Sequence, residues 1–308
     1  MNKVIVTGAS GFIGTALVKE LINQKVKVFA VIREGSKYPN FFDNNKDIVI
    51  INCSMDEYHT LPSLIKEKNF DALYHLAWEG TSGPLRSNYS VQIKNIRQSC
   101  NLVEVSRDLN CKKIVFAASI MEYEIQSLIN ADIMPNISSI YSIAKMSADY
   151  MMKTMASNYK IDYIRAIISN VYGPGELSPR IINTSLRKLI NGEHCSFSSG
   201  EQMYDFIYIS DAAKEFYIIG EKGKGNKSYY IGSLRPKPLK EFLLEMKNLV
   251  NPNIEIGLGE LPFCGVSLKY DEFDIFAIRD DTGFVPEVTF TEGINRTIEW
   301  VKSEKKNS

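Results

Sequence analysis

The chain has 308 residues, and its 36 basic residues are balanced by 36 acidic ones. This length can bury a large core, in one large domain or in two closely joined domains. The balanced charge gives no reason to expect a nucleic acid or an anionic membrane as a partner. Five cysteines and three histidines lack the spacing of metal ligands, so we expect no metal site and a reducing cytoplasmic setting. Strand-like sequence begins at residue 3 and no apolar run is long enough to span a bilayer, so we expect neither a signal peptide nor a membrane.

The first predicted element is a strand from Lys3 to Thr7, which runs directly into a glycine-rich turn. Gly8 can adopt the turn, Gly11 lets the main chain approach a ligand, and Gly14 lets a helix lie close to the strand. Residues 12–22 have the periodicity of that helix, whose first amides are suited to a pyrophosphate. We therefore predict a dinucleotide site, with a plain strand-to-helix turn as the alternative.

Strand-like runs then alternate with helical patterns over the first half of the chain. The runs lie at residues 25–32, 47–52, 71–76, 112–119 and 161–169. Such alternation favours an α/β fold, and the nearly continuous apolar runs are typical of strands covered on both faces. We predict a doubly wound parallel Rossmann sheet, with ligands at the carboxyl ends of its strands.

The alternation loosens beyond residue 175. Helical patterns lie at residues 179–191, 210–220, 239–249 and 291–302, and strand-like runs at 205–209 and 228–231. We therefore predict a smaller, interleaved C-terminal domain. Residues 1–170 plus about 205–232 would form the dinucleotide-binding domain, and about 171–204 plus 233–308 the substrate domain.

The end of the second strand bears on which dinucleotide binds. A ribose 2′-phosphate needs a cation there, whereas a free 2′-hydroxyl is usually met by an acidic residue. Arg33 can pair bidentately with a phosphate, helped by Ser36 and Lys37, although Arg33 could also be an ordinary polar residue at a strand end. Glu34 is the competing feature. The sequence favours NADP(H) and leaves NAD(H) as the alternative.

A candidate reactive pair follows the fifth strand. Tyr141 and Lys145 lie four residues apart in a helical segment, so their side chains share one face. An ammonium beside a phenol favours the phenolate, and such a tyrosine can give or take a proton at a hydroxyl or carbonyl group. Ser119 ends the strand at residues 113–119 and can hydrogen-bond the same substrate oxygen. The alternatives are an exposed tyrosine with a helical neighbour and a serine that caps a turn.

At this point the chain resembles a known family, the extended short-chain dehydrogenase/reductases that act on nucleotide sugars, over nearly its whole length. The marks of this resemblance are Thr7-Gly-Ala-Ser-Gly-Phe-Ile-Gly14, Tyr74-His-Leu-Ala77, Asn95 with Asn101-Leu-Val-Glu104, Ser119 with Tyr123, Tyr141-x-x-x-Lys145, Asn170-Val-Tyr-Gly-Pro-Gly175, Asp205-Phe-Ile-Tyr-Ile-Ser-Asp211, Thr282-Gly-Phe-Val-Pro286, Glu292-Gly293 and Trp300. Together these motifs are specific for the family, but not for one reaction.

The resemblance implies roles for the reactive residues. Tyr141 would be the catalytic acid/base, Lys145 its activator and a ligand of the nicotinamide ribose, and Ser119 the hydroxyl that orients the substrate. Asn170 and Val171 would lie between nicotinamide and substrate, and the second domain would bind the nucleotide diphosphate. The implied cofactor-binding residues are Gly8, Gly11, Phe12, Ile13, Gly14, Arg33, Leu76, Ala77, Tyr141, Lys145 and Val171. Family members commonly form homodimers through the helices that correspond to residues 88–108 and 141–158, whose apolar positions could equally be core.

Departures from the family pattern narrow the set of reactions that the sequence is expected to support. The 4,6-dehydratases of the family place an Asp-Glu pair directly after the hydroxyl residue, where this chain has Ile120-Met121. Without those carboxylates we do not expect a dehydration. Glu122, one position further on, is a candidate substrate contact, and a structural role is the alternative.

Phosphate-binding arginines of the family are also missing. Gln202-Met203-Tyr204 stands where many relatives carry an arginine, and only Lys269 lies near the position of a second one. Arg180 and Arg187 of the preceding helix could compensate as substrate-binding residues.

The leading hypothesis from the sequence is an NADPH-dependent reductase of a nucleotide-activated 4-keto-6-deoxyhexose, with Tyr141 as the proton donor. The alternative is an NAD-dependent nucleotide-sugar 4-epimerase, which retains its cofactor through a cycle of oxidation and reduction. A second alternative is a non-catalytic sensor that binds a dinucleotide. Arg33 favours the reductase over the epimerase, and the set of Ser119, Tyr141 and Lys145 disfavours the sensor.

Overall fold

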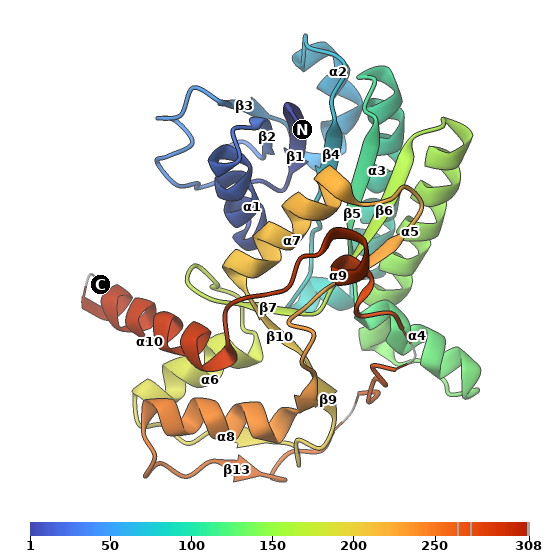
Figure 1. Ribbon diagram of the computed structural model, residues 1–308. Helices are drawn as coiled ribbons and strands as arrows, with labels where there is room; N and C mark the ends of the chain where they lie inside the picture. Colours follow the sequence, from blue (N-terminus) through green and yellow to red (C-terminus); the bar gives the residue numbers. More distant parts are fainter. Residues whose placement is uncertain (264, 272, 307–308) are drawn as a thin grey trace. The chain divides into compact units, whose positions relative to one another are not determined.

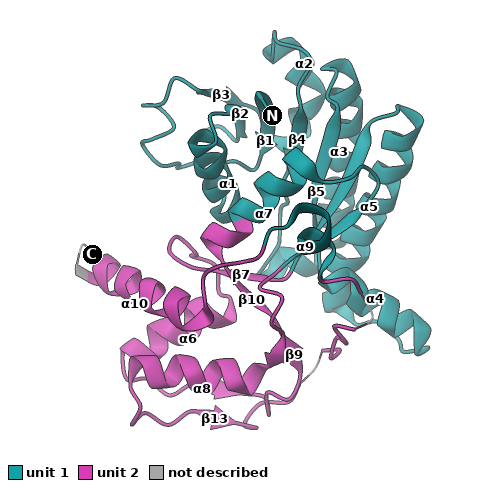
Figure 2. Cartoon of the chain, in the orientation of Figure 1, with its two compact units in different colours: residues 1–168, 213–231, 276–284 teal, residues 169–212, 232–275, 285–308 magenta. Residues whose placement is uncertain are grey.

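The computed structural model describes residues 1–263, 265–271 and 273–306 of the chain, shown in Figure 1. These residues divide into two compact units, which are coloured separately in Figure 2. Unit 1 comprises Met1–Ile168, Ala213–Ile231 and Phe276–Phe284, and unit 2 comprises Ser169–Ala212, Gly232–Ile275 and Val285–Ser308. The chain therefore passes between the units several times.

Unit 1 is built on a parallel sheet. Within the described residues, seven strands pair in the order β11-β6-β5-β4-β1-β2-β3, and all of these pairings are parallel. The strands are β1 (Lys3–Thr7), β2 (Lys27–Ile32), β3 (Ile48–Asn52), β4 (Ala72–His75), β5 (Lys113–Ser119), β6 (Asp162–Ile168) and β11 (Ser228–Ile231). This confirms the predicted doubly wound Rossmann sheet, in which the strand order reverses between β1 and β4.

Helices cover both faces of this sheet (Figure 1). They are α1 (Phe12–Asn23), η1 (Met55–Thr60), α2 (Leu61–Leu64), η2 (Pro84–Ser87), α3 (Tyr89–Asp108), α4 (Met121–Asn130), η3 (Ile137–Ser139), α5 (Ile140–Asn158), most of α7 (Ile209–Lys222) and α9 (Ala277–Thr282). On one face Leu73 packs in a buried cluster with Leu102 of α3, while Gly220 of α7 lies against Tyr74 on the other face. Successive residues of β4 thus serve opposite layers, which is why the strand is buried throughout and its first three residues are Ala72, Leu73 and Tyr74.

Within the described residues, unit 2 combines short strand pairs with helices α6, α8 and α10 and the first turn of α7. Its elements are β7 (Asn170–Tyr172), α6 (Ile181–Ile190), β8 (Ser196–Phe197), β9 (Met203–Tyr204), β10 (Phe206–Tyr208), β12 (Lys237–Pro238), α8 (Leu239–Val250), β13 (Gly257–Leu258) and α10 (Phe290–Lys306). Strand β7 pairs with β10, β9 with β12, and β8 with β13. An aromatic group of Tyr172, Phe206, Phe242 and Phe290 packs between the strands and helices.

The division differs from the predicted domain limits in two segments. Residues 276–284 belong to unit 1, because Asp281 of α9 bonds Lys224, Lys227 and Tyr229 beside β11. Residues 205–212 belong to unit 2, because β10 pairs with β7 rather than with the large sheet. Local periodicity predicts neither the side-chain bonds of Asp281 nor the strand that pairs with β10. The sequence analysis therefore assigned each of these two segments to the other domain.

Two further observations concern the composition of the chain. Cys53, Cys100, Cys111 and Cys195 are free thiols, and Cys264 lies outside the described residues. In the part of the chain that the structure describes, no helix combines the length and the apolar character needed to cross a bilayer.

Candidate functional site

The glycine-rich turn joins β1 to α1 at the point where the strand order reverses. Gly8 has a φ of +69°, and a Cβ there would lie 2.7 Å from the Ala77 nitrogen. A Cβ on Gly14 would overlap the carbonyl oxygen of Gly8. Both positions therefore exclude a side chain, one by backbone conformation and both by close approach.

This turn fits the pyrophosphate of a dinucleotide. Helix α1 begins at Phe12 without a capping side chain and without an acidic residue in its first turn, so no side chain of the helix start competes for its first amide donors. Phe12 and Ile13 are half-buried at this helix start, and Leu76 and Ala77 follow β4 beside Gly8. The predicted cofactor residues of this turn thus lie around one cradle.

Arg33 and Glu34 follow β2, and both are exposed. The Arg33 carbonyl accepts the Ser36 amide at 3.0 Å and so closes a turn. Neither side chain forms an ion pair or a hydrogen bond with the described residues, so both remain available to a ligand.

Lys145 is buried in α5 and its ammonium group contacts β5. Its Nζ atom donates to the Ala117 carbonyl at 2.9 Å, and it lies 3.9 Å from the ring centroid of Trp78 and 4.8 Å from that of Phe116. Burial lowers the pKa of Lys145 to about 7, while the nearby carboxylates of Glu122 and Asp149 act in the opposite direction. The ammonium is therefore poised to lose its proton near neutral pH.

Tyr141 lies one turn before Lys145 on α5 and is 6% exposed. Its ring makes an edge contact with Trp78, with ring centroids 6.2 Å apart. The guanidinium carbon of Arg86 lies 4.1 Å from the Tyr141 ring centroid. The candidate acid/base thus lies between an indole and a guanidinium group.

Ser119 ends β5, two residues beyond the carbonyl that holds Lys145. Its hydroxyl oxygen accepts the Met121 amide at 3.2 Å, and its own amide donates to Glu122 Oε1 at 2.8 Å. Lys145 and Ser119 therefore meet the carboxyl end of the same strand, where the sequence predicted a site.

Glu122 belongs to a buried charge network. Its Oε2 atom pairs with Arg165 Nη2 at 2.8 Å, and Arg165 Nε lies 2.9 Å from Asp149 Oδ2. Tyr163 also donates to Asp149 Oδ1 at 2.7 Å. Burial raises the pKa of both carboxyl groups, and the Arg165 cation opposes that shift. Both carboxylate oxygens of Glu122 are engaged inside unit 1. This geometry favours a structural role for Glu122 over a contact with the substrate.

His75 is buried at the end of β4 and ties three elements together. Its Nδ1 atom lies 2.8 Å from Thr7 Oγ1 of β1, and its Nε2 atom lies 2.9 Å from Ser99 Oγ of α3. Burial lowers the pKa of His75 to about 3, so the imidazole is neutral at physiological pH.

In unit 2, a cavity of about 190 Å³ brings several predicted residues together. Asn170, Val171 and Arg180 line it. The Asn170 amide donates to the Asp205 carbonyl at 3.1 Å, which fixes its orientation. Arg180 is half-exposed and lies 4.0 Å from Glu176. Arg187 does not line this cavity; its guanidinium pairs with Glu304 at 2.6 Å and lies over the Trp300 ring.

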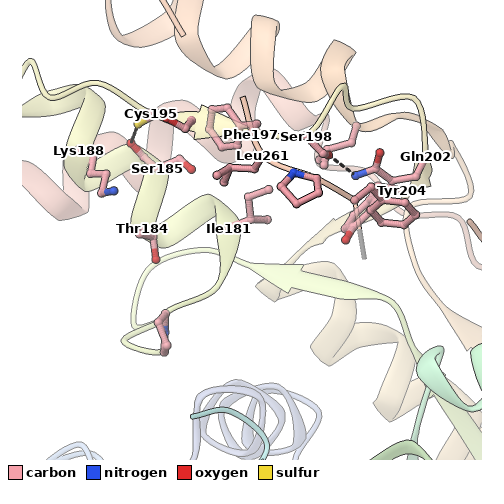
Figure 3. Close-up of a pocket in the computed structure, with 15 residues that line it drawn as sticks. Ile181, Thr184, Ser185, Lys188, Cys195, Phe197, Ser198, Gln202, Tyr204 and Leu261 are labelled. Carbon is pink, nitrogen blue, oxygen red and sulfur yellow. Dashed lines mark hydrogen bonds between the residues drawn. The ribbon is translucent and has the colours of Figure 1, made fainter. Parts of the chain in front are cut away.

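A larger cavity of about 400 Å³ in unit 2 was missed by the sequence analysis (Figure 3). Phe197, Leu261 and Ile181 surround its middle, whereas Lys188 and Gln202 lie toward its two ends. Gln202 Nε2 donates to Ser198 Oγ at 3.0 Å. In the sequence, Gln202 marked this region, because it stands where many members of the family carry a phosphate-binding arginine.

The sequence also missed several residues that surround Tyr141 and Lys145. They are Trp78, Arg86 and Asp149, together with Gln92, which bonds Trp78, and Arg165, which pairs with Asp149. Asp149 stands four residues after Lys145, and Trp78 follows directly after the Tyr74-His-Leu-Ala77 motif, so both had a positional signal. Arg86 and Arg165 had none, because their contacts depend on the tertiary fold.

Comparisons with known proteins agree with this architecture. The chain is 23% identical over 339 residues to dTDP-glucose 4,6-dehydratase 1 of Escherichia coli (strain K12), covering 99% of this chain and 94% of that protein. Its fold is similar to WbmF of Bordetella bronchiseptica in complex with NADH, at 24% identity and a TM-score of 0.78, covering 99% and 93% of the two chains. It is also similar to the UDP-N-acetylglucosamine 4-epimerase of Methanobrevibacter ruminantium M1, at 24% identity and a TM-score of 0.82, covering 98% and 99%. Because residues 4–232 match the family as a whole, the chain belongs to the NAD dependent epimerase/dehydratase family.

Proposed function

We propose that this protein is an NADPH-dependent reductase of a nucleotide-activated 4-keto-6-deoxyhexose. The observation that carries the proposal is the set of Ser119, Tyr141 and Lys145, together with the absence of acidic residues at positions 120 and 121. The set provides proton transfer and oxyanion stabilisation, which a carbonyl reduction requires.

The surroundings of Ser119 argue against water elimination. Ile120 is buried and its amide donates to the Ile168 carbonyl, and Met121 begins α4. Glu122, the nearest carboxylate in sequence, is neutralised by Arg165. Within the described residues, the carboxylate nearest to Ser119 in sequence is therefore already engaged and is not free for the proton transfers of a dehydration.

Each residue of the set has a defined task in a reduction. A bound nicotinamide would supply the hydride. Ser119 would hydrogen-bond the keto oxygen and Tyr141 would donate a proton to it, so that the negative charge developing on that oxygen is neutralised. Lys145 would replenish the proton of Tyr141, since its own pKa of about 7 places it near the working pH.

Arg33 supports NADP(H) as the cofactor, because its exposed guanidinium follows β2, where a ribose 2′-phosphate would need a cation. Glu34 is adjacent and equally exposed, and it supports a second candidate. If Glu34 rather than Arg33 meets the ribose, the cofactor is NAD(H) and the function is a nucleotide-sugar 4-epimerase, as the Methanobrevibacter ruminantium protein is named.

The substrate class follows from the cavities of unit 2 and from the names of the relatives. One similar protein is named for dTDP-glucose and another for UDP-N-acetylglucosamine, so we propose a nucleoside diphosphate sugar. In the larger cavity Phe197 provides an aromatic face for a base and Lys188 a cation for a phosphate. Arg180 is a stronger phosphate ligand than Arg187, because Arg187 is already paired with Glu304.

A homodimer is part of the proposal. Helices α3 and α5 expose large apolar side chains to solvent, namely Tyr89, Ile93, Ile143, Tyr150 and Met151. Such residues on neighbouring helices support burial against a second copy. Light scattering of the purified protein would give twice the mass of the chain if this is so, and the mass of one chain if it is not.

The cofactor experiment separates the two candidate functions. NADPH and NADH are titrated by fluorescence into the wild type, Arg33→Ala and Glu34→Ala, after any cofactor released by denaturation has been identified. A reductase should purify with an empty site, bind NADPH more tightly, and lose that preference in Arg33→Ala but not in Glu34→Ala. NAD(H) that stays bound through purification, with a loss of affinity in Glu34→Ala, would instead establish the epimerase.

A further inference from the structure

A loop between β4 and α3 is clamped by one buried amide. Trp78 Nε1 donates to Gln92 Oε1 at 2.8 Å, while Gln92 Nε2 donates to the carbonyls of Gly80 and Leu85 at 3.2 and 3.0 Å. Gln92 is 1% exposed. Asn95 adds two bonds to the main chain of Glu79. The loop from residue 78 to residue 86 is therefore held at both ends by side chains of α3.

This loop carries Arg86 to the candidate acid/base. Arg86 Nη1 donates to the Thr81 carbonyl at 2.9 Å, which fixes the guanidinium from within the loop. The guanidinium carbon then lies 4.1 Å from the Tyr141 ring centroid. Trp78, at the other end of the loop, contacts both Tyr141 and Lys145. One loop thus positions a cation on the tyrosine and an aromatic face on the lysine.

Lys145, one turn after Tyr141 on α5, carries a charge that changes with pH. Its ammonium is bonded to Ala117, lies against two aromatic rings, and has a pKa of about 7 because it is buried. Around neutral pH a large fraction of Lys145 is therefore uncharged. An arginine does not lose its proton in this range, so Arg86 remains a cation when Lys145 is neutral.

We propose that Arg86 is a positioning residue of this site, which holds the ring of Tyr141 and stabilises its phenolate as a permanent cation. The inference rests on the proposed function in giving Tyr141 the role of acid/base. A cation against a ring gains attraction as that ring becomes negative, so the phenolate is favoured over the phenol.

Other charged and titratable groups belong to the buried network beside Lys145. They are His75 on β4, Glu122 on α4, Asp149 on α5 and Arg165 on β6. His75 is neutral over the working range, and Glu122 and Asp149 share the Arg165 cation. Substitution of Arg86 leaves this set in place, so a change in the titration of Tyr141 reports on Arg86.

The test is a titration of Tyr141 without cofactor or substrate. Protein labelled with ¹³C at the tyrosine Cζ atom is followed by NMR against pH, and the Tyr141 signal is assigned by its loss in Tyr141→Phe. In Arg86→Met and Arg86→Gln the pKa of Tyr141 should rise by about one pH unit. Arg86→Lys keeps the charge without the planar contact and should give a smaller rise.

Arg107→Met is the matched control, because Arg107 lies 4.9 Å from the Tyr159 ring centroid on the surface and should leave Tyr141 unchanged. An unchanged Tyr141 midpoint in the Gln and Lys variants of Arg86 would overturn the proposal, even if the Met variant did not fold. Since no turnover is measured, a protein with no reductase activity would still decide the role of Arg86.

Activity provides a second readout. In the direction that oxidises an alcohol, Tyr141 acts as the base, so Arg86→Gln should move the rising limb of the kcat/KM profile to higher pH by the same amount. Its activity should recover to the wild-type value at high pH. A uniform loss of activity at every pH would contradict the proposed electrostatic role.

Discussion

Unit 1 and unit 2 hold their candidate functional residues in different ways. In unit 1, Ser119, Tyr141 and Lys145 are at most 9% exposed, and each has partners inside the unit. In unit 2, the Arg180 side chain is 45% exposed and forms only a long ion pair of 4.0 Å with Glu176 among the described residues. The reacting groups are thus preorganised, whereas the candidate phosphate ligand is open to solvent.

This contrast has an energetic basis. A buried charge must be paired, so the charges of unit 1 are coupled to its stability as well as to its chemistry. An exposed arginine contributes little to stability and can be changed at small cost. We therefore expect substitutions in unit 1 to alter rate or stability, and substitutions in unit 2 to alter substrate binding. Four predictions test this distinction.

Tyr141→Phe should have the largest effect. The substitution removes only the hydroxyl, so kcat should fall by about 10²–10⁴-fold because proton transfer is lost. Cofactor affinity should stay within about twofold, since the ring and its contacts with Trp78 and Arg86 remain. Steady-state kinetics and NADPH titration give the two values, and a surviving kcat would remove Tyr141 from the mechanism.

Arg165→Met should be the most destabilising change. It leaves Glu122 and Asp149 buried without their shared cation, at a cost of about 3–5 kcal/mol in the free energy of unfolding. Arg296→Met, which removes a half-exposed pair with Glu292, is the control and should cost less than about 1 kcal/mol. Urea denaturation measures both, and equal losses would contradict the contrast between buried and exposed charges.

Arg180→Ala should change binding alone. Loss of one phosphate contact at an exposed site should raise KM by about tenfold and leave kcat within about twofold. Arg187→Ala should raise KM less, because Arg187 is paired with Glu304. A fall in kcat with unchanged KM in Arg180→Ala would place Arg180 in the chemical step instead.

Lys145→Met should alter how stability depends on pH. The pKa of Lys145 is about 7 in the folded chain and about 10.4 in the unfolded chain, so the unfolded chain binds more protons between these values. Wild-type stability should therefore gain up to about 1.4 kcal/mol per pH unit from this group as the pH rises from 7 to 10. Below pH 7 the full penalty of burying the ammonium is present.

The variant lacks this contribution, so the difference in unfolding free energy between wild type and Lys145→Met is the quantity to follow. Urea denaturation at pH 7, 8 and 9 should show the difference changing in favour of the wild type. A difference that stays constant with pH would mean that Lys145 is protonated throughout this range.

Much of the parallel sheet could be predicted because its signals are local. Apolar runs identified the seven strands described for this sheet to within two residues at each end, and β1 and β11 have the predicted limits. The glycine-rich turn could also be predicted from local sequence, since backbone conformation and close approach require glycine at positions 8 and 14. The helix at Met121–Asn130 was not predicted, because the residues after Ser119 were interpreted from the family motif rather than from helical periodicity.

The unpredicted parts of the site depend on contacts between distant residues. The engagement of Glu122 depends on Arg165, 43 positions later, and the contact between Arg86 and Tyr141 depends on a loop held by Gln92. The larger cavity of unit 2 is assembled from α6, β8 and a segment near residue 261. The residue types were visible in the sequence, but the contacts that give them a role were not.

The most direct test of the proposed function follows a labelled hydride. The protein is mixed with NADPH carrying deuterium at nicotinamide C4 and with nucleoside diphosphate 4-keto-6-deoxyhexoses, and the sugar product is examined by mass spectrometry and NMR. We predict deuterium at C4 of the sugar, one NADPH consumed for each sugar reduced, and neither result in Tyr141→Phe. Inversion of a nucleotide sugar at C4 by a tightly held NAD(H), with no net use of reduced cofactor, would contradict the reductase.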